Sequence, residues 1–192
     1  MDFFNSAYRG TPPWDIGRPQ KEFVELVRRG EITGSVLDIG CGTGEHALFF
    51  AAEGHEVWGI DSAPLAIEKA KEKAEERGLH VHFVLMDVLE LRKLNRTFDT
   101  ATDSGLFHTL SDEDRPVFVN ALTSVLLTGG RYFMLCFSDE EPPGYGPRRI
   151  TRREIRESFR DGWTIDYIRP ATFESRTRTE GPRAWLSSIS RK

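Results

Sequence analysis

The segment Val36–His46, VLDIGCGTGEH, constrains the fold more than any other part of this chain. An apolar strand that carries Asp38 runs directly into a loop with glycine at positions 40, 42 and 44. A strand that turns at once into a helix needs residues that tolerate positive φ, and only glycine does so at little cost. A loop without Cβ atoms also lets its backbone lie against a ligand. The segment therefore predicts a strand–turn–helix unit that binds a nucleoside-containing cofactor.

The glycine spacing and the neighbouring acidic residues indicate the class of cofactor. In the dinucleotide fingerprint the glycines follow G-x-G-x-x-G, and a pyrophosphate sits on the helix N-terminus. Here Gly44 comes one position early, Glu45 follows it, and Asp38 lies at the strand end. Carboxylates at these places would repel a pyrophosphate and attract an ammonium group. A cofactor with a cationic amino-acid moiety and no phosphate therefore fits better than NAD, and no Gly-Lys-Ser/Thr follows as in a P-loop.

Strand and helix patterns alternate along the chain, which predicts an α/β fold with a doubly wound, mostly parallel sheet. Cofactors in such sheets lie at the carboxyl ends of the strands, where Asp38, Asp61, Asp87 and Asp103 all fall. The expected strands cover 35–39, 56–60, 80–86, 97–103, 131–138, 163–168 and 184–190, and the expected helices cover 19–29, 46–53, 64–77, 113–127 and 151–159.

Composition agrees with a single enzyme-sized domain. The chain has 192 residues with 39% hydrophobic content, enough to bury a substantial core. No apolar run approaches the roughly 18 residues of a membrane span, and the N-terminus does not resemble a secretory signal. The only cysteines, Cys41 and Cys136, suggest no disulfide framework. His80 and His82 share a strand face without a third ligand nearby, so we expect no metal site. A cytoplasmic protein is the expectation.

Five sequence motifs, in the same order along residues 33–138, resemble those of the class I S-adenosylmethionine-dependent methyltransferases. VLDIGCGTGEH resembles their motif I, Asp61 in GIDSAP their ribose-binding acid, and Asp87 in VLMDVLEL the acid near the adenine amino group. Phe98 to His108 resembles the fourth strand and its loop, and Gly129-Gly130 precedes the fifth strand. The resemblance implies S-adenosylmethionine as cofactor and a Rossmann-like, seven-stranded sheet with an antiparallel C-terminal hairpin. The cofactor contacts it implies are Asp38, Gly40, Cys41, Gly42, Asp61, Ser62, Asp87 and the Val88 amide.

The outer segments resemble the small-molecule branch of that family. YRGTPPWDIGRPQ near the N-terminus and DSGLFHTLSDEDR after the fourth strand are similar to the thiopurine and heterocyclic-toxin methyltransferases. That resemblance implies methyl transfer to S, N or O of a small, often aromatic acceptor.

The N-terminal arm, residues 1–20, is a candidate lid. Pro12 and Pro13 stiffen a segment that carries Trp14, whose indole could cover the cofactor and lie near a cation. Arg18 and Gln20 are candidate polar contacts of the lid. The alternative is a terminal arm that packs on the sheet edge.

His108 and Asp103 are the candidate catalytic residues. His108 follows the fourth expected strand, and the usual pKa of histidine would let it accept a proton near neutral pH. It could equally line the pocket. Asp103 could hold the cofactor's ammonium group or orient His108. For the acceptor pocket we expect Phe107, Pro143 and Tyr145, the last two from the loop that opens the segment 139–192.

Charge distribution raises an alternative class of substrate. Residues 147–192 carry twelve Lys or Arg against six Asp or Glu, whereas residues 1–146 carry fourteen against twenty-four. A basic end can signal nucleic acid, but its arginines alternate with glutamates as on a solvated helix face. We therefore expect no nucleic-acid partner and a monomer or dimer. An RNA or protein methyltransferase, a non-catalytic S-adenosylmethionine-binding protein and, more distantly, a dinucleotide oxidoreductase are the alternatives.

Overall fold

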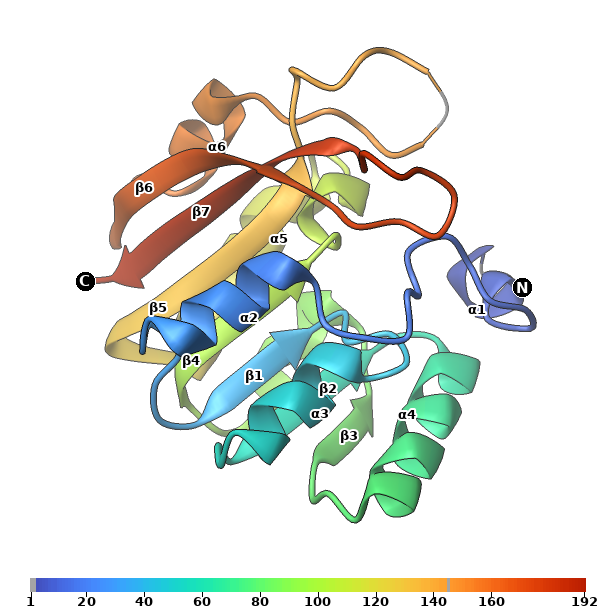
Figure 1. The fold of residues 1–192 in the computed structure, drawn as a ribbon. Helices are drawn as coiled ribbons and strands as arrows, with labels where there is room; N and C mark the ends of the chain where they lie inside the picture. The colour runs from blue at the N-terminus through green and yellow to red at the C-terminus, as the bar shows by residue number, and fades with distance from the viewer. Residues whose placement is uncertain (1–2, 145) are drawn as a thin grey trace.

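A seven-stranded sheet forms the centre of the computed structural model, which describes residues 3–144 and 146–192 (Figure 1). The strand order is β3-β2-β1-β4-β5-β7-β6. Neighbours from β3 to β5 pair in parallel, and β7 lies antiparallel to both β5 and β6. The predicted doubly wound, mostly parallel sheet with an antiparallel C-terminal hairpin is confirmed. The strands are β1 (Val36–Ile39), β2 (Val57–Asp61), β3 (His82–Leu85), β4 (Phe98–Ser104), β5 (Leu126–Phe137), β6 (Trp163–Thr172) and β7 (Arg183–Arg191).

Helices cover both faces of the sheet. One apolar cluster joins α2, α3 and α4 to the sheet, and another joins η1, α5 and α6 to it. Figure 1 shows α2 and α3 in front of β1 and α5 behind β5. The helices are α1 (Phe3–Ala7), α2 (Lys21–Arg28), α3 (Glu45–Ala52), α4 (Pro64–Arg77), α5 (Asp114–Val125) and α6 (Arg152–Ser158), with 3-10 turns η1 (Val88–Leu94) and η2 (Phe107–Thr109).

Local sequence signals explain the best-predicted helix. The helix α4 spans the predicted residues 64–77, because Pro64 stands at its first turn and Gly78 ends it in the left-handed region at φ 62°. The short helix α1 and the turns η1 and η2 were not predicted from the sequence.

The start of β5 differs most from its prediction. This strand begins at Leu126, five residues before the expected start, because Leu126 pairs with Phe98 of β4 ahead of a register shift. Gly130 allows this close pairing, since a Cβ there would lie 2.9 Å from the Asp99 carbonyl oxygen. The apolar pattern through Leu127 had instead suggested a longer α5.

Candidate functional site

The glycine loop between β1 and α3 brings three left-handed backbone positions together. Gly40, Gly42 and Gly44 have φ of 69°, 54° and 84°. A Cβ on Gly42 would lie 2.8 Å from the Tyr8 hydroxyl oxygen, and one on Gly44 would lie 2.8 Å from Cζ of Phe83. Gly42 therefore makes room for the N-terminal arm, whereas Gly44 lets α3 pack against the sheet.

Asp61, the last residue of β2, is tied to the glycine loop. Its Oδ2 accepts a hydrogen bond from the Gly42 amide at 2.9 Å, and its Oδ1 accepts one from the Ala63 amide at 2.8 Å. The side chain is nearly buried. These contacts hold a carboxylate at the carboxyl edge of the sheet, beside the loop, where the sequence predicted it.

Asp38 lies beneath the loop rather than on its surface. Its Oδ1 accepts a hydrogen bond from the Thr102 hydroxyl at 2.9 Å, and the residue is 1% exposed. Burial raises the pKa of its carboxyl to about 7. Among the described residues Oδ2 has no hydrogen-bond partner at full bonding geometry, although the Ala47 amide at the first turn of α3 lies near enough to lower the pKa somewhat. Asp38 thus braces the start of α3 from within the core.

Asp103 occupies a different role from the expected one. Its Oδ1 accepts the Leu106 amide at 2.7 Å, and its Oδ2 accepts the Phe107 amide at 2.9 Å and the Tyr132 hydroxyl at 2.8 Å. The residue is fully buried, which raises its pKa to about 6. The carboxylate therefore fixes the turn after β4, and these contacts orient neither His108 nor a ligand in the cleft.

His108 lies in η2, enclosed by aromatic rings of two other segments. Its Nδ1 accepts a hydrogen bond from the Phe137 amide at 3.0 Å, and its ring centroid lies 5.0 Å from that of Phe137 and 5.9 Å from that of Phe173. Burial, with the charges of Arg149 and Arg115, lowers the pKa of its imidazole to about 3. An imidazole with so low a pKa binds a proton only weakly, which argues against the expected base role.

The N-terminal arm folds over the glycine loop. Tyr8 is buried, and its hydroxyl accepts a hydrogen bond from Trp14 Nε1 at 3.1 Å. Lys69 of α4 holds the arm from below, since its Nζ donates to the carbonyl oxygens of Tyr8 at 2.7 Å and Gly10 at 3.1 Å. Trp14 itself remains 42% exposed, with its ring against Phe3, Phe4 and Tyr8. Sequence reasoning missed Tyr8, although it opens the segment singled out for the arm.

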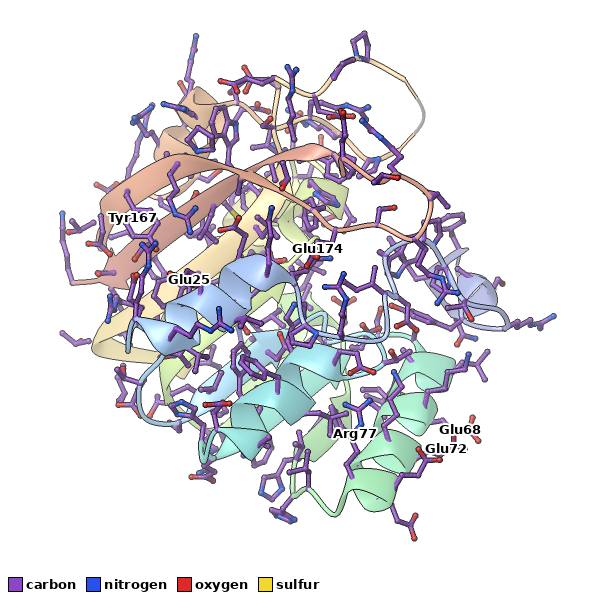
Figure 2. All side chains as sticks on the ribbon, viewed as in Figure 1. Glu25, Glu68, Glu72, Arg77, Tyr167 and Glu174 are labelled. Atoms are coloured by element: carbon purple, nitrogen blue, oxygen red, sulfur yellow. The ribbon has the colours of Figure 1, made fainter. Side chains whose placement is uncertain are left out.

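The loop between β6 and β7 holds the other end of the arm. Glu174 lies beside the first turn of α2 (Figure 2). The side-chain amide of Gln20 bonds both backbone groups of Glu174, and the Glu174 carboxylate accepts the Lys21 amide at 2.9 Å and pairs with Arg18 at 2.8 Å. These contacts join the N-terminal arm to the hairpin loop, although the two segments lie near opposite ends of the sequence.

A cleft forms where the arm, the glycine loop and the β6–β7 loop meet. It brings together Trp14, Arg18, Gly40, Cys41 and Gly42 of the predicted cofactor residues, with Gln20, the other predicted polar contact of the lid. Among its described lining residues, the other members are Tyr8, Asp15, Ile16, Thr43, Glu45, His46, Ser104 and Phe173. Phe173 was not singled out from the sequence, because nothing local marks a residue that reaches the cleft only through the C-terminal hairpin.

Glu45 lines the cleft, but its charge is paired, which weakens the sequence argument that used this charge against a pyrophosphate. Its carboxylate pairs with Lys73 at 2.7 Å and with Arg77 at 2.9 Å (Figure 2 shows Arg77 extending from α4). Two cations of α4 therefore neutralise this acid.

The remaining predicted cofactor residues lie around the carboxyl edge of the sheet. Cys41 donates its amide to the Ile60 carbonyl at 2.8 Å, while burial raises the pKa of its thiol. Ser62 is exposed. Asp87 is also exposed and accepts the Leu89 amide at 2.9 Å as the cap of η1, and Val88 is buried.

The three predicted acceptor residues are not brought together. Phe107 is fully buried in the core, where its ring contacts Phe118 and Phe159, so it lines no cleft here. The backbone amide of Phe107 donates to Asp103 Oδ2 in the turn after β4. Pro143 is exposed on the loop after β5, and Tyr145 lies outside the described residues.

Two further findings concern the described part of the chain. None of its helices has the length and apolar character to cross a membrane. No group of three or more His, Cys, Asp or Glu side chains there could hold a metal ion.

Comparison with known proteins identifies the family. A family model described as a methyltransferase domain matches residues 36–130. A 2-heptyl-1-hydroxyquinolin-4(1H)-one methyltransferase from Mycobacteroides abscessus is 39% identical over 182 residues, covering 89% of this chain and 80% of the relative. The chain belongs to the class I S-adenosylmethionine-dependent methyltransferases. The predicted membership of this family is therefore confirmed. The prediction that the protein is an enzyme of the transferase class is also confirmed.

Solved structures agree with this methyltransferase fold. A structure described as "Conversion of a Disulfide Bond into a Thioacetal Group during Echinomycin Biosynthesis" has a TM-score of 0.89 and 36% identity, covering 98% of this chain and 91% of that chain. Magnesium protoporphyrin IX methyltransferase from Synechocystis, solved with bound S-adenosylmethionine, has a TM-score of 0.67 and 23% identity, covering 90% and 77%. Because its identity is only 23%, the Synechocystis structure supports the fold alone.

Proposed function

We propose that this methyltransferase binds S-adenosylmethionine in the cleft between the glycine loop and the N-terminal arm and transfers its methyl group to S, N or O of a small aromatic or heterocyclic acceptor. One observation carries the proposal: the glycine loop, the Asp61 carboxylate and the hydrogen-bonded pair Tyr8–Trp14 lie together at one edge of the sheet. Such an edge is where open α/β sheets bind nucleotides.

The side chains present suit a nucleoside that carries an amino acid and no pyrophosphate. Among the described residues that line the cleft, the one Arg or Lys is Arg18, which pairs with Glu174. We expect Asp61 to accept hydrogen bonds from the ribose hydroxyls, and the backbone of Gly40 and Gly42 to contact the methionine end. We expect Asp87 and the Val88 amide to contact the adenine. Asp38 and Asp103 support the loop and the turn beneath them.

The chain's own contribution is alignment and exclusion of water. The bound cofactor supplies an activated methyl group. Tyr8 and Trp14 lie over the glycine loop, and Phe173 and Ser104 line the part of the cleft where we propose that the acceptor binds. Holding two reactants in line can supply several kcal/mol of the barrier. The Mycobacteroides abscessus relative is named for a hydroxyquinolinone, a heteroaromatic small molecule, which supports an acceptor of that class.

We further propose that residues 1–192 form one domain, in which 1–20 are the lid arm, 33–138 the cofactor-binding core, and 139–192 the acceptor loop and C-terminal strands. The arm is supported by its bonds to Lys69 and Glu174.

The test is to incubate the protein with methyl-labelled S-adenosylmethionine and a panel of aromatic thiols, phenols, N-heterocycles, bulk RNA and a protein mixture. Transfer to a small aromatic supports the proposal and identifies the atom methylated. Label on RNA or protein alone would overturn the acceptor class and make residues 147–192 the substrate platform. Cofactor binding by equilibrium dialysis without transfer to any acceptor would indicate a non-catalytic binder.

A further inference from the structure

The hydrogen bond at His108 Nδ1 determines where the imidazole carries its proton. Because Nδ1 accepts the Phe137 amide N–H at 3.0 Å, a neutral ring must be protonated at Nε2. This tautomer is assigned from the hydrogen bond. Nε2 has no hydrogen-bond partner among the described residues. The ring therefore presents an N–H donor, and a second proton could enter only by breaking the bond to the Phe137 amide.

The Nε2 edge lies beside Gly105, next to two residues that line the cleft. A Cβ placed on Gly105 would lie 3.6 Å from Nε2 and 3.8 Å from Cε1 of Phe173. Ser104, next to Gly105, and Phe173 both line the cleft. An acceptor atom that enters between Gly105 and Phe173 would therefore meet the N–H of His108.

Positive charge and apolar rings surround the imidazole. From the loop after β5, the Arg149 guanidinium lies 5.6 Å from the Phe137 ring centroid, and from α5 the Arg115 guanidinium lies 5.2 Å from that of Phe107. Phe137 and Phe173 pack on the ring from β5 and from the β6–β7 loop. The buried carboxylate of Asp103 in β4 is engaged by the Leu106 and Phe107 amides and the Tyr132 hydroxyl. Arg115 is itself paired with Asp112 at 3.3 Å and with Glu154 at 3.4 Å, which partly neutralises it. Burial of the ring, with the guanidinium of Arg149 and the remaining charge of Arg115, therefore opposes an imidazolium, and these cations attract an anion.

We infer that His108 acts as a fixed Nε2–H hydrogen-bond donor to the acceptor and that the site selects acceptors whose nucleophilic atom is already ionised: aromatic thiolates and acidic aromatic hydroxyls. This inference rests on the proposed methyl transfer. In the step, the anionic O or S donates an electron pair to the methyl carbon. The bond from that carbon to the cofactor's sulfur breaks, its electron pair stays on sulfur, and no proton moves.

A donor of this kind stabilises the bound anion in surroundings that contain little water. Hydrogen bonds to charged groups contribute more than those between neutral groups. The gain is partly offset because a hydrogen-bonded anion is less nucleophilic. A neutral phenol with a pKa of about 10 must lose its proton before transfer, and His108 Nε2, which already carries a proton, does not accept it, so such a phenol is expected to be a poor acceptor.

The test compares kcat/KM against pH for thiophenols and phenols whose acidity is graded by ring substituents. We expect each profile to rise with pH and level off at the acceptor's own pKa, so that the inflection moves along the series. A single inflection that is the same for every acceptor would reveal an enzymic base and overturn the inference.

Two variants separate a donor from a base. His108→Gln keeps an amide N–H donor near the Nε2 position, whereas His108→Phe removes it. We expect about tenfold or greater loss of kcat/KM in His108→Phe and a smaller loss in His108→Gln. Equal, large losses in both would indicate a base. His55→Gln, at a surface histidine bonded to the Gly34 carbonyl, is the matched control.

A readout without turnover completes the test. The absorbance of 4-nitrophenol bound with S-adenosylhomocysteine reports its ionisation. We expect the anion to persist to lower pH in wild type and His108→Gln than in His108→Phe; an identical titration in all three would overturn the inference. If wild type binds cofactor but methylates no acceptor, the proposed function fails and the inference with it. Transfer with an invariant inflection would overturn the inference alone.

Discussion

Gln20 and Glu174, 154 positions apart in the sequence, are joined by two hydrogen bonds: Gln20 Nε2 donates to the Glu174 carbonyl at 3.0 Å, and the Glu174 amide donates to Gln20 Oε1 at 2.6 Å. The Gln20 side chain is 3% exposed. The backbone amide of Gln20 also donates to Nε2 of His46 in α3 at 3.0 Å. One residue thus ties the N-terminal arm to both the hairpin loop and the helix that follows the glycine loop.

Gln20→Ala is expected to weaken S-adenosylmethionine binding by about tenfold, because loss of two buried hydrogen bonds releases the arm from the hairpin loop. Isothermal titration calorimetry measures the affinity. Lys21→Ala is the matched control, since Lys21 bonds Glu174 through its backbone amide and that bond survives the change. Equal affinities in both variants would contradict a role of Gln20 in holding the lid.

Asp61→Ala is expected to reduce cofactor affinity by about tenfold or more, since it removes the carboxylate placed to accept the ribose hydroxyls and frees the Gly42 amide. Equilibrium dialysis with labelled cofactor measures the effect. Asp161→Asn, on an exposed residue before β6, controls for loss of a charge. Unchanged affinity in Asp61→Ala would rule out the ribose assignment.

Gly42→Ala is expected to displace Tyr8, because the new Cβ would lie 2.8 Å from the tyrosine hydroxyl oxygen. Gly54→Ala is a matched control with φ of 93° and no atom within 4 Å of the added Cβ. Both variants carry the cost of an alanine at positive φ, about 1 kcal/mol. Cofactor affinity should fall in Gly42→Ala and stay near wild type in Gly54→Ala; a similar fall in both would mean that backbone strain alone is responsible.

Asp38 should make the stability of the protein depend on pH in a predictable direction. Its folded-state pKa of about 7 lies above the usual value, so the folded chain binds this proton more tightly than the unfolded chain. Its contribution is fully present below the unfolded pKa of about 3.9 and is lost as pH rises towards 7, at up to about 1.4 kcal/mol per unit of difference. Asp38→Asn should therefore gain stability relative to wild type over this interval, as measured by urea unfolding.

Asp99→Asn provides the control of opposite sign. Hydrogen bonds from the Ser35 amide and hydroxyl lower the pKa of the Asp99 carboxyl, so its stabilisation is present at neutral pH and is lost as the pH falls through that lowered value. The variant should be destabilised at neutral pH and approach wild type in acid. A flat difference between Asp38→Asn and wild type from pH 4 to 7 would contradict the raised pKa of Asp38.

The sequence predicted the sheet and the glycine loop well, because both depend on short-range patterns. Apolar runs in the sequence stop at a glycine or an acidic residue. These stops predict the strand ends at Asp61 and near Asp103 and the turn through Gly40 and Gly42. The same patterns could not assign roles to individual carboxylates. From the sequence, Asp103 was expected at a strand end, where it could contact the cofactor. In the structure its carboxylate oxygens accept hydrogen bonds from the Leu106 and Phe107 amides and from the Tyr132 hydroxyl of the neighbouring strand.

By itself, the sequence determined the α/β class with its mostly parallel sheet and the position of the glycine loop, and it predicted the kind of cofactor. Glycine's tolerance of positive φ and the alternation of apolar segments are local properties. Only the tertiary structure decided that Phe107 is core, that Gln20 and Glu174 join arm to hairpin, and that His108 carries its proton on Nε2. Each of these depends on atoms brought within hydrogen-bonding or van der Waals distance from segments remote in the chain, and no local pattern encodes such distances.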